Sequence, residues 1–279
     1  MKRALVACLV IACGRESTPT ATEAPRAKQT LRVAVVGGMM ETGFWSEIAA
    51  RYERASGDKI ELAASGPKPQ VVAAFAKGGI DVITVHASDA MVNLVADGLA
   101  RDPQPWARND LVIVGPSADP AGIRGGTDAI AALKKIIASK APLLVHASHG
   151  ADGVLHDLTE AGQLELDPVA TMRFDGENQH EILAAAKAKG AYTMVGRIPV
   201  LLGKLRAEGI EIMVRGDPKL RRPYLVEVAR TAQSGADDLV AFLRSAETQA
   251  FIATFKKGDY DEAPLFFPVV PEPPATAPR

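Results

Sequence analysis

The chain has 279 residues, with 32 Lys and Arg against 33 Asp and Glu, and its formal net charge is -1. This balance argues against a nucleic-acid-binding protein, because there is no cationic excess to neutralise phosphates. Hydrophobic residues make up 47% of the chain, which suits one large domain or two domains of about 100–150 residues each.

The N-terminus has the charge and hydropathy pattern of a bacterial secretory signal. A positive start is followed by the apolar stretch Ala4–Ala12, which is too short to span a membrane as a stable anchor. Val10–Cys13 fits a lipobox, and the residues after it are rich in Ser, Thr and Pro, as in a flexible tether. We therefore predict a signal peptide over 1–12, a lipidated Cys13 with its tether over 13–29, and a protein held at the membrane of the periplasm or cell envelope. A frayed N-terminal helix is the alternative.

Short apolar runs alternate with amphipathic stretches along the rest of the chain. Strands are predicted over Leu31–Val36, Lys59–Ala64, Asp81–His86, Asp110–Val114 and Pro142–His146, and helices over Phe44–Ala55, Val71–Ala76, Met91–Ala96, Thr127–Ser139 and Val154–Ala161. The alternation continues through Glu181–Lys189, Tyr192–Val195, Val200–Glu208, Ile210–Val214 and Tyr224–Val228 to closing helices over Asp237–Arg244 and Gln249–Phe255. Thr127 is a plausible helix cap. This pattern predicts an α/β fold with mostly parallel sheets, followed by a disordered tail over 269–279.

Six blocks of sequence carry a resemblance to a known family, roughly from Thr30 to Pro268. They are Asp81–Ala87, Arg108–Pro116, Asp119–Ile123, Lys189–Thr193, Gly216–Pro218 and Pro264–Pro268. In order and spacing they resemble the tungstate-binding extracytoplasmic solute-binding proteins of ABC transporters. The resemblance implies a periplasmic-binding-protein fold of the second type, in which two α/β lobes face each other across a ligand cleft. We expect lobe 1 to comprise 30–113 plus 228–268 and lobe 2 to comprise 114–227, with crossing strands near Asp110–Gly115 and Tyr224–Val228.

The same resemblance implies a function. Such a protein binds a small oxyanion, tungstate or molybdate, at loops that open helices, where free N–H groups and the positive dipole end suit an anion. The closed form is then read by an ABC permease with its ATPase. We accordingly expect a monomer that binds a small anionic solute, with no catalysis, no cofactor, no resident metal and no nucleic-acid partner.

The loops expected to bind the ligand depart from the family pattern. Val35–Gly38 replaces a Thr-rich run, Ala147 replaces an Arg, and Ala151–Gly153 replaces Ser-Gly-Thr. Acidic residues appear on these loops, and a desolvated carboxylate would oppose a divalent oxyanion, so another small anion or polar solute stays open. Arg197 matches a basic residue of the family, with a surface salt bridge as its alternative role. The candidate ligand-binding residues are Gly37, Gly38, Thr42, His146, Ser148, His149, Gly153, Gly176, His180 and Arg197.

Histidines on these loops leave a second function open. His146, His149 and His180, with Asp152 or Glu177, offer nitrogen and oxygen ligands for Zn²⁺ or another divalent metal. They could instead donate hydrogen bonds to an anion, some of them protonated, or simply be solvated. A metal site would weaken below about pH 6.5, whereas an anion site that uses protonated His would tighten, and we expect the second trend. The alternative function is a divalent-metal-binding or sensory protein on the same fold, with no transport role.

Two further features have structural interpretations. His86 lies inside a block that matches the family, and we expect it to be structural. Met39 and Met40 are expected to pack under Trp45 rather than to line the cleft.

Overall fold

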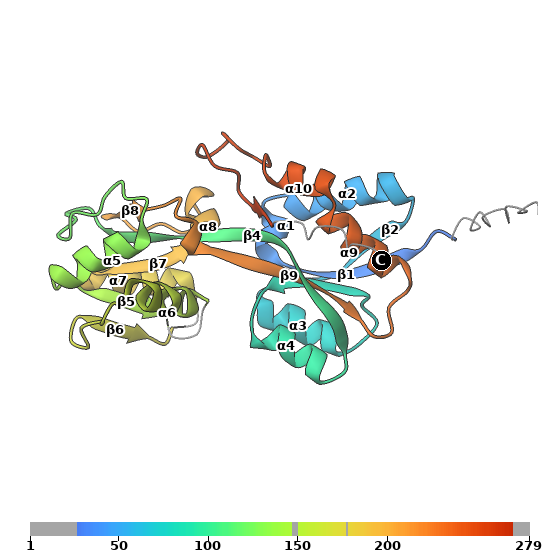
Figure 1. Ribbon diagram of the computed structural model, residues 1–279, viewed down its shortest axis with the longest axis horizontal. Coiled ribbons are helices and arrows are strands. Elements are labelled where there is room, and N and C mark those ends of the chain that lie inside the picture. Colours follow the sequence, from blue (N-terminus) through green and yellow to red (C-terminus); the bar gives the residue numbers. More distant parts are fainter. Residues whose placement is uncertain (1–26, 147–149, 177, 270–279) are drawn as a thin grey trace, which may run out of the picture.

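The computed structural model describes residues 27–146, 150–176 and 178–269, which form two α/β lobes joined by two long strands (Figure 1). The first lobe holds β1 (Thr30–Val36), α1 (Gly37–Glu41), α2 (Phe44–Ser56), β2 (Lys59–Gly66), α3 (Lys68–Ala76), β3 (Val82–His86), α4 (Asp89–Ala96), α9 (Gly235–Arg244), α10 (Ala246–Ile252) and β10 (Phe267–Pro268). The second lobe holds α5 (Ala129–Ala138), β5 (Leu143–His146), α6 (Ala151–Gly162), β6 (Thr171–Phe174), α7 (Gln179–Lys189), β7 (Tyr192–Gly196), α8 (Arg197–Leu201), β8 (Ile210–Val214) and the 3₁₀ turn η1 (Pro218–Leu220). The connecting strands are β4 (Ala100–Pro116) and β9 (Arg221–Ala229).

The change of pairing along β4 marks the passage between the lobes. Over Ala100–Asp110 it pairs with β9, and over Leu111–Pro116 it pairs with β7 and β8. Strand β9 pairs with β3 and β4 of the first lobe along its whole length. The chain therefore enters the second lobe at Leu111, a little before the expected boundary at 113. It is paired with the first lobe again from Arg221, before the expected boundary at 227.

The sheets are mixed, which corrects the expectation of mostly parallel sheets. The outer strands are parallel, because β1 pairs with β2 and β3, and β5 pairs with β6 and β7, in that sense. Every pairing that involves β4 or β9 is antiparallel. The reason is the chain path: β4 leaves the first lobe and β9 returns to it beside β4, in the opposite direction.

Stacked aromatic rings form the centre of the first lobe. The rings of Phe266 and Trp106 lie 4.0 and 5.6 Å from that of Phe44, nearly parallel to it. Phe266 belongs to the last segment of the described chain, which therefore packs onto the first lobe (Figure 1). The backbone N–H of Val269 donates to Gln249 Oε1 at 2.8 Å, so this residue belongs to the fold, although the sequence placed it in the tail.

Three element ends differ from the sequence expectations. The carbonyl of Gln29 accepts a hydrogen bond from Lys59 N–H at 2.8 Å, so the fold begins inside the predicted tether. Asp128, not Thr127, caps α5, because its side chain accepts from the N–H of Ala131. The interval 200–208 is mostly turns, since α8 ends at Leu201 and is followed by a glycine with a φ of 69°.

The predicted signal peptide, Cys13 and most of the tether lie outside the described residues. Within the described ranges, no helix combines the length and the apolar character needed to cross a bilayer.

Candidate functional site

A pocket of about 200 Å³ lies between the two lobes, where the connecting strands pass. Its walls come from the first lobe (Gly38, Glu41, His86), the connecting strands (Asn109, Arg222, Tyr224) and the second lobe (Gln179, Gly196, Ile198, Pro199, Leu202). A smaller adjoining pocket shares Gln179, Gly196 and Arg222 and adds His146 and Ala151. We refer to the larger one as the cleft pocket. Its position between the lobes is where this architecture brings distant parts of the chain together.

Arg222, near the start of β9, is the charged side chain common to both pockets. Its Nη2 lies 3.5 Å from His86 Nε2, and its Nη1 lies so close to Gly150 that a Cβ there would be 2.7 Å away. Its Nε is buried without a hydrogen-bond partner, and no carboxylate of the described residues lies within ion-pair distance of it. Burial lowers the pKa of the guanidinium, yet arginine remains protonated in proteins. Among the described residues this positive charge has no ion-pair partner, and only the more distant carboxylate of Asp110, which is paired with Arg197, acts on it.

A second cation strengthens the positive potential beside Arg222. Lys68 begins α3, and partial burial together with the charge of Arg222 lowers the pKa of its amine. Burial, followed by the charges of Arg222 and Lys68, holds the pKa of His86 well below its usual value. The imidazole is therefore neutral near pH 7, and its ring centroid lies 4.1 Å from that of Tyr224, with the two ring planes tilted by 31°. Two cations and a neutral imidazole suit an anion.

The first predicted loop reaches the cleft pocket in part. Gly37 and Gly38 begin α1, and Gly38 lines the pocket. Thr42 is 3% exposed, and its Oγ1 donates to the carbonyls of Gly38 at 3.0 Å and Met39 at 3.2 Å. Its hydroxyl is thus engaged at the end of α1. Met39 is buried in the core, in agreement with the packing role expected for it.

The second predicted loop contributes His146 at the end of β5. This side chain is 2% exposed and lines the smaller pocket, with its ring edge-on to Phe174. Burial lowers the pKa of its imidazole. The expected tightening at low pH required protonated histidines, and burial opposes protonation at both His146 and His86. Ser148 and His149 lie outside the described residues.

Three other predicted residues are described but line neither pocket. Gly153 lies in the first turn of α6. Gly176 is closely approached by the Phe174 ring and the Glu181 carboxylate, so a Cβ there would clash. His180 is exposed, and its backbone N–H donates to Asn178 Oδ1, the cap of α7, at 3.0 Å.

Arg197, the basic residue predicted for the ligand, is instead surrounded by protein acceptors. It is 1% exposed, its Nε lies 2.7 Å from Asp110 Oδ1, and its Nη1 lies 3.0 Å from the Asp261 carboxylate. Its Nη2 donates to the carbonyl of Pro264. These partners compete with any ligand, and they make the ion pair buried rather than superficial. A ligand role for Arg197 stays an untested prediction that this geometry does not favour.

The carboxylates and histidines of the predicted metal set are only partly described. Asp152 is partly exposed and forms an ion pair with Arg173 at 3.1 Å. Across the ranges that the structure covers, no group of three His, Cys, Asp or Glu side chains is placed to hold a metal ion. His149 and Glu177, which the metal hypothesis also invoked, are outside those ranges.

Sequence reasoning did not include Arg222, Lys68, Asn109 or Gln179 among the ligand residues. One signal was available: two consecutive arginines, Arg221 and Arg222, lie just before the strand expected to cross between the lobes, separated from it only by Pro223. A basic residue at a crossing strand is placed at the cleft by the topology alone.

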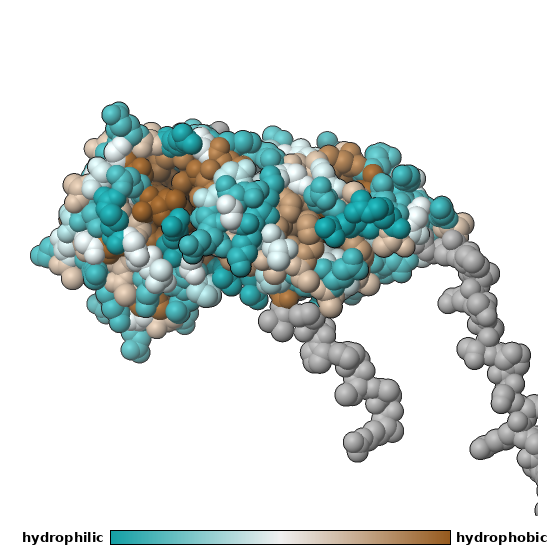
Figure 2. Space-filling model, turned by 90° about the horizontal axis from the view of Figure 1, so that it is seen from above, coloured by the Kyte–Doolittle hydropathy of each residue, from teal (hydrophilic) through white to brown (hydrophobic). Residues whose placement is uncertain are grey.

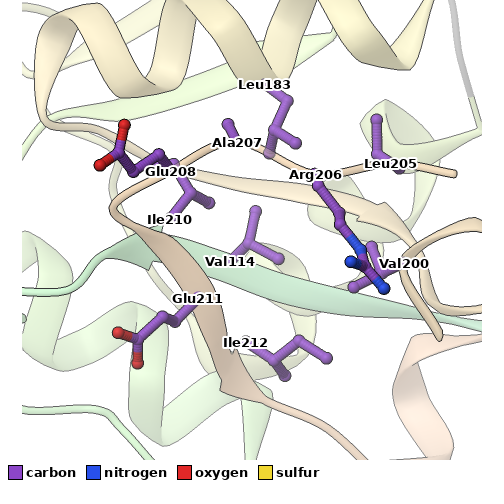
Figure 3. Close-up of a pocket in the computed structure, with 10 residues that line it drawn as sticks. All are labelled: Val114, Leu183, Val200, Leu205, Arg206, Ala207, Glu208, Ile210, Glu211 and Ile212. Carbon is purple, nitrogen blue, oxygen red and sulfur yellow. The ribbon is translucent and has the colours of Figure 1, made fainter. Parts of the chain in front are cut away.

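A separate apolar hollow of about 340 Å³ lies on the second lobe, outside the cleft. Branched apolar side chains from β4, α7 and β8 point into it, whereas Glu208 and Glu211 stand at its edge (Figure 3). Figure 2 shows hydrophobic surface gathered in a hollow of this lobe, at the left of the view. Val200 of α8 lines the hollow, whereas Ile198 and Pro199 line the cleft pocket.

Comparison with known proteins identifies the family of the chain. The family model of the bacterial extracellular solute-binding proteins matches residues 31–255. The chain belongs to this family. The family consists of solute-binding proteins rather than enzymes, which confirms the expectation that the chain is not an enzyme.

Two curated relatives resemble the chain over most of its length. It is 25% identical over 277 residues to the tungstate-binding protein TupA of Peptoclostridium acidaminophilum, covering 95% of this chain and 94% of the relative. It is 28% identical over 256 residues to a protein of Haloferax volcanii provisionally named an ABC transporter anion-binding protein, covering 86% of this chain and 72% of the relative. The predicted family resemblance is therefore confirmed at the level of distant homology.

The architecture is confirmed by a solved structure. The tungstate-binding protein TupA of Desulfovibrio alaskensis G20 superimposes with a TM-score of 0.67 at 26% identity, covering 86% of this chain and 99% of that structure. The two-lobed α/β architecture of this chain is the periplasmic-binding-protein fold of the second type, as predicted.

Proposed function

We propose that this protein is the anion-binding component of an ABC importer and that the anion binds in the cleft pocket. The observation that carries the proposal is Arg222, a partly buried guanidinium between the lobes with no carboxylate partner among the described residues. A charge left in this state is costly unless it is paired, and an incoming anion supplies the missing partner.

The rest of the pocket supports the same function. The charge of Lys68 acts on Arg222 and His86, so that a second cation favours an anion over a neutral solute. The relatives in Haloferax volcanii and Peptoclostridium acidaminophilum are named for anion and tungstate binding. Walls drawn from both lobes allow ligand binding to bias lobe closure, which a permease with its ATPase would recognise.

The protein would work outside the cytoplasm, held at the membrane by lipid on Cys13, as a monomer. Replacing Cys13 by Ala should release it in soluble form. Mass spectrometry of the native membrane fraction that finds an unmodified Cys13 would contradict the anchor without affecting the proposed cleft.

Titration calorimetry with a panel of small anions tests the proposed site. Arg222→Gln should weaken binding at least tenfold, because a hydrogen bond to a charged group contributes about 1.5–3 kcal/mol. Arg230→Gln is the matched control, since Arg230 is an exposed residue just beyond the same strand and its replacement removes the same charge. Equal affinity of the two variants would place the anion elsewhere.

A further inference from the structure

We infer that the preferred ligand of the cleft pocket is a small organic monocarboxylate with an apolar body, rather than a bare tetrahedral oxyanion. This inference rests on the proposed function and concerns the chemical class of the anion. It comes from the distribution of polar and apolar groups over the walls of the pocket.

The charged wall of the pocket suits one carboxylate. Arg222 is the only cation among the lining residues, and its planar fork matches the two oxygens of a carboxylate. His86 lies 3.5 Å from it and is neutral, so it adds a hydrogen-bonding group without a second charge. Lys68 adds positive potential without lining the pocket. The polar wall therefore offers one directed ion pair.

The remaining described lining of the pocket carries polar groups but no further cation. Among the described residues, no Ser or Thr lines the cleft pocket or the smaller adjoining one; Ser148 lies outside those residues. Gln179 Oε1 accepts from Gly196 N–H at 2.9 Å, so Gln179 offers its side-chain amide N–H groups as donors, and Asn109 adds a second side-chain amide to the lining. Glu41 adds a negative charge, although it pairs with Lys204 at 2.7 Å. A tetrahedral oxyanion with two charges would therefore meet a single cationic side chain among the described lining residues, and an acidic one besides.

Another part of the pocket lining is apolar and comes from α8 and from the residue that follows it. Ile198, Pro199 and Leu202 line the pocket there, and Tyr224 adds its ring. A bare oxyanion would either leave water in contact with these apolar side chains or lose its own hydration against them. A branched or aromatic body would bury apolar surface there. The volume of about 200 Å³ exceeds the needs of a carboxylate group alone. One end of the ligand is thus charged and the other apolar.

The test compares two anion classes on the same protein by titration calorimetry. Isovalerate and benzoate represent the carboxylates, and tungstate and sulfate represent the tetrahedral oxyanions. We expect the carboxylates to bind more tightly. Leu202→Gln should weaken isovalerate binding roughly tenfold, as the loss of a matched apolar contact does. Arg222→Gln should weaken every anion that binds.

The outcomes separate this inference from the proposed function. Tungstate binding that equals or exceeds carboxylate binding, and that depends on Arg222, would overturn the ligand class and keep the anion site. Carboxylate binding that is insensitive to Leu202→Gln would also overturn it, because the apolar wall would then be unused. No binding by any of the four anions would overturn both proposals. Melting temperatures of the unliganded variants show whether each is folded, and the ranking of the four anions on the unaltered protein decides the class without any variant.

Discussion

Two arginines close to the passage between the lobes have opposite surroundings. Arg197 opens α8 and meets Asp110 at 2.7 Å and Asp261 at 3.0 Å, with all three side chains at most 9% exposed. Arg222, near the start of β9, has a buried Nε without a partner and a neutral imidazole as its neighbour. The guanidinium of Arg197 is neutralised by carboxylates of the protein itself. The guanidinium of Arg222 has no ion-pair partner among the described residues.

The difference shows how to tell a structural cation from a binding one. A buried charge must be paired, and the partner is either part of the fold or comes from outside. Glu227 adds a third case, because both of its carboxylate oxygens are buried and without a partner, and burial raises its pKa to about 7. A carboxylic acid can escape the penalty by binding a proton, whereas arginine cannot. An unpaired buried arginine therefore points to a ligand more strongly than an unpaired buried carboxylate does.

The strongest test of this contrast is the stability of the two arginine variants. Arg197→Gln should cost about 3–5 kcal/mol of unfolding free energy, because it leaves two carboxylates buried without their partner. Arg222→Gln should not lower stability and should raise it slightly, because it removes a partly buried charge that has no ion-pair partner among the described residues. Urea unfolding of both variants without ligand measures the difference. Comparable losses would mean that Arg222 is also structural.

Glu227 sharpens the comparison through pH. Burial raises the pKa of its carboxyl to about 7 in the folded protein, from an ordinary value of about 4.5. The favourable contribution of the protonated Glu227 to the free energy of unfolding is therefore complete below about pH 4.5 and is lost as pH rises towards 7. Each pKa unit corresponds to about 1.4 kcal/mol, so the loss amounts to about 3 kcal/mol.

Glu227→Gln, which cannot ionise, tests that linkage. The variant should be more stable than the unaltered protein at about pH 8 and close to it at about pH 4.5. Glu165→Gln serves as the control, because Glu165 is exposed and a surface carboxylate should change little. A stability difference that does not depend on pH would show that Glu227 is neutral throughout or has an undetected partner.

Anion affinity should depend on pH through Lys68 rather than through the histidines. Burial and the charge of Arg222 lower the pKa of Lys68, and an anion binds better to its protonated form. Affinity should therefore be nearly constant between about pH 6 and 8, and should fall severalfold as alkaline pH deprotonates Lys68. Lys68→Gln should bind more weakly near pH 7 and lose the alkaline decline. Affinity that rises from pH 6 to 8 would favour a metal instead.

Local periodicity was sufficient to predict most elements of the fold, but not the partners of its charges. The strand Leu31–Val36 and the helix Phe44–Ala55 were expected nearly where β1 and α2 lie, because their apolar residues recur at strand and helix spacing. The resemblance then supplied the two lobes. Short elements such as α1 and β6 carry too few residues for a period to emerge, and neither was predicted.

The candidate site depended on contacts that a single sequence does not reveal. Arg197 reaches Asp110 across 87 positions and Asp261 across 64, so nothing near it in sequence marks it as paired. Arg222 reaches His86 across 136 positions. The loops were predicted because they follow strands. Arg222, the cation that lines the pockets beside them, comes instead from a connecting strand. Only the topology brings that strand beside the loops.

The smallest expected effect concerns the exposed ion pair between the lobes. Lys204 Nζ lies 2.7 Å from Glu41 Oε2, with both side chains 51% exposed, and Glu41 also lines the cleft pocket. An exposed pair contributes at most about 1 kcal/mol, so Glu41→Gln should hardly alter stability. It should nevertheless raise anion affinity about twofold to threefold at low salt, because it removes a negative charge from the lining of the pocket that contains Arg222. Since both charges are solvated, the gain should disappear at about 1 M salt, where screening acts within about 3 Å.

Lys204→Gln removes the other member of the pair and should weaken anion binding instead. Calorimetry of the two variants at both salt concentrations measures the change in anion affinity that each causes. Equal changes would mean that the ion pair between the lobes affects binding. Opposite changes would mean that the local charge near Arg222 does.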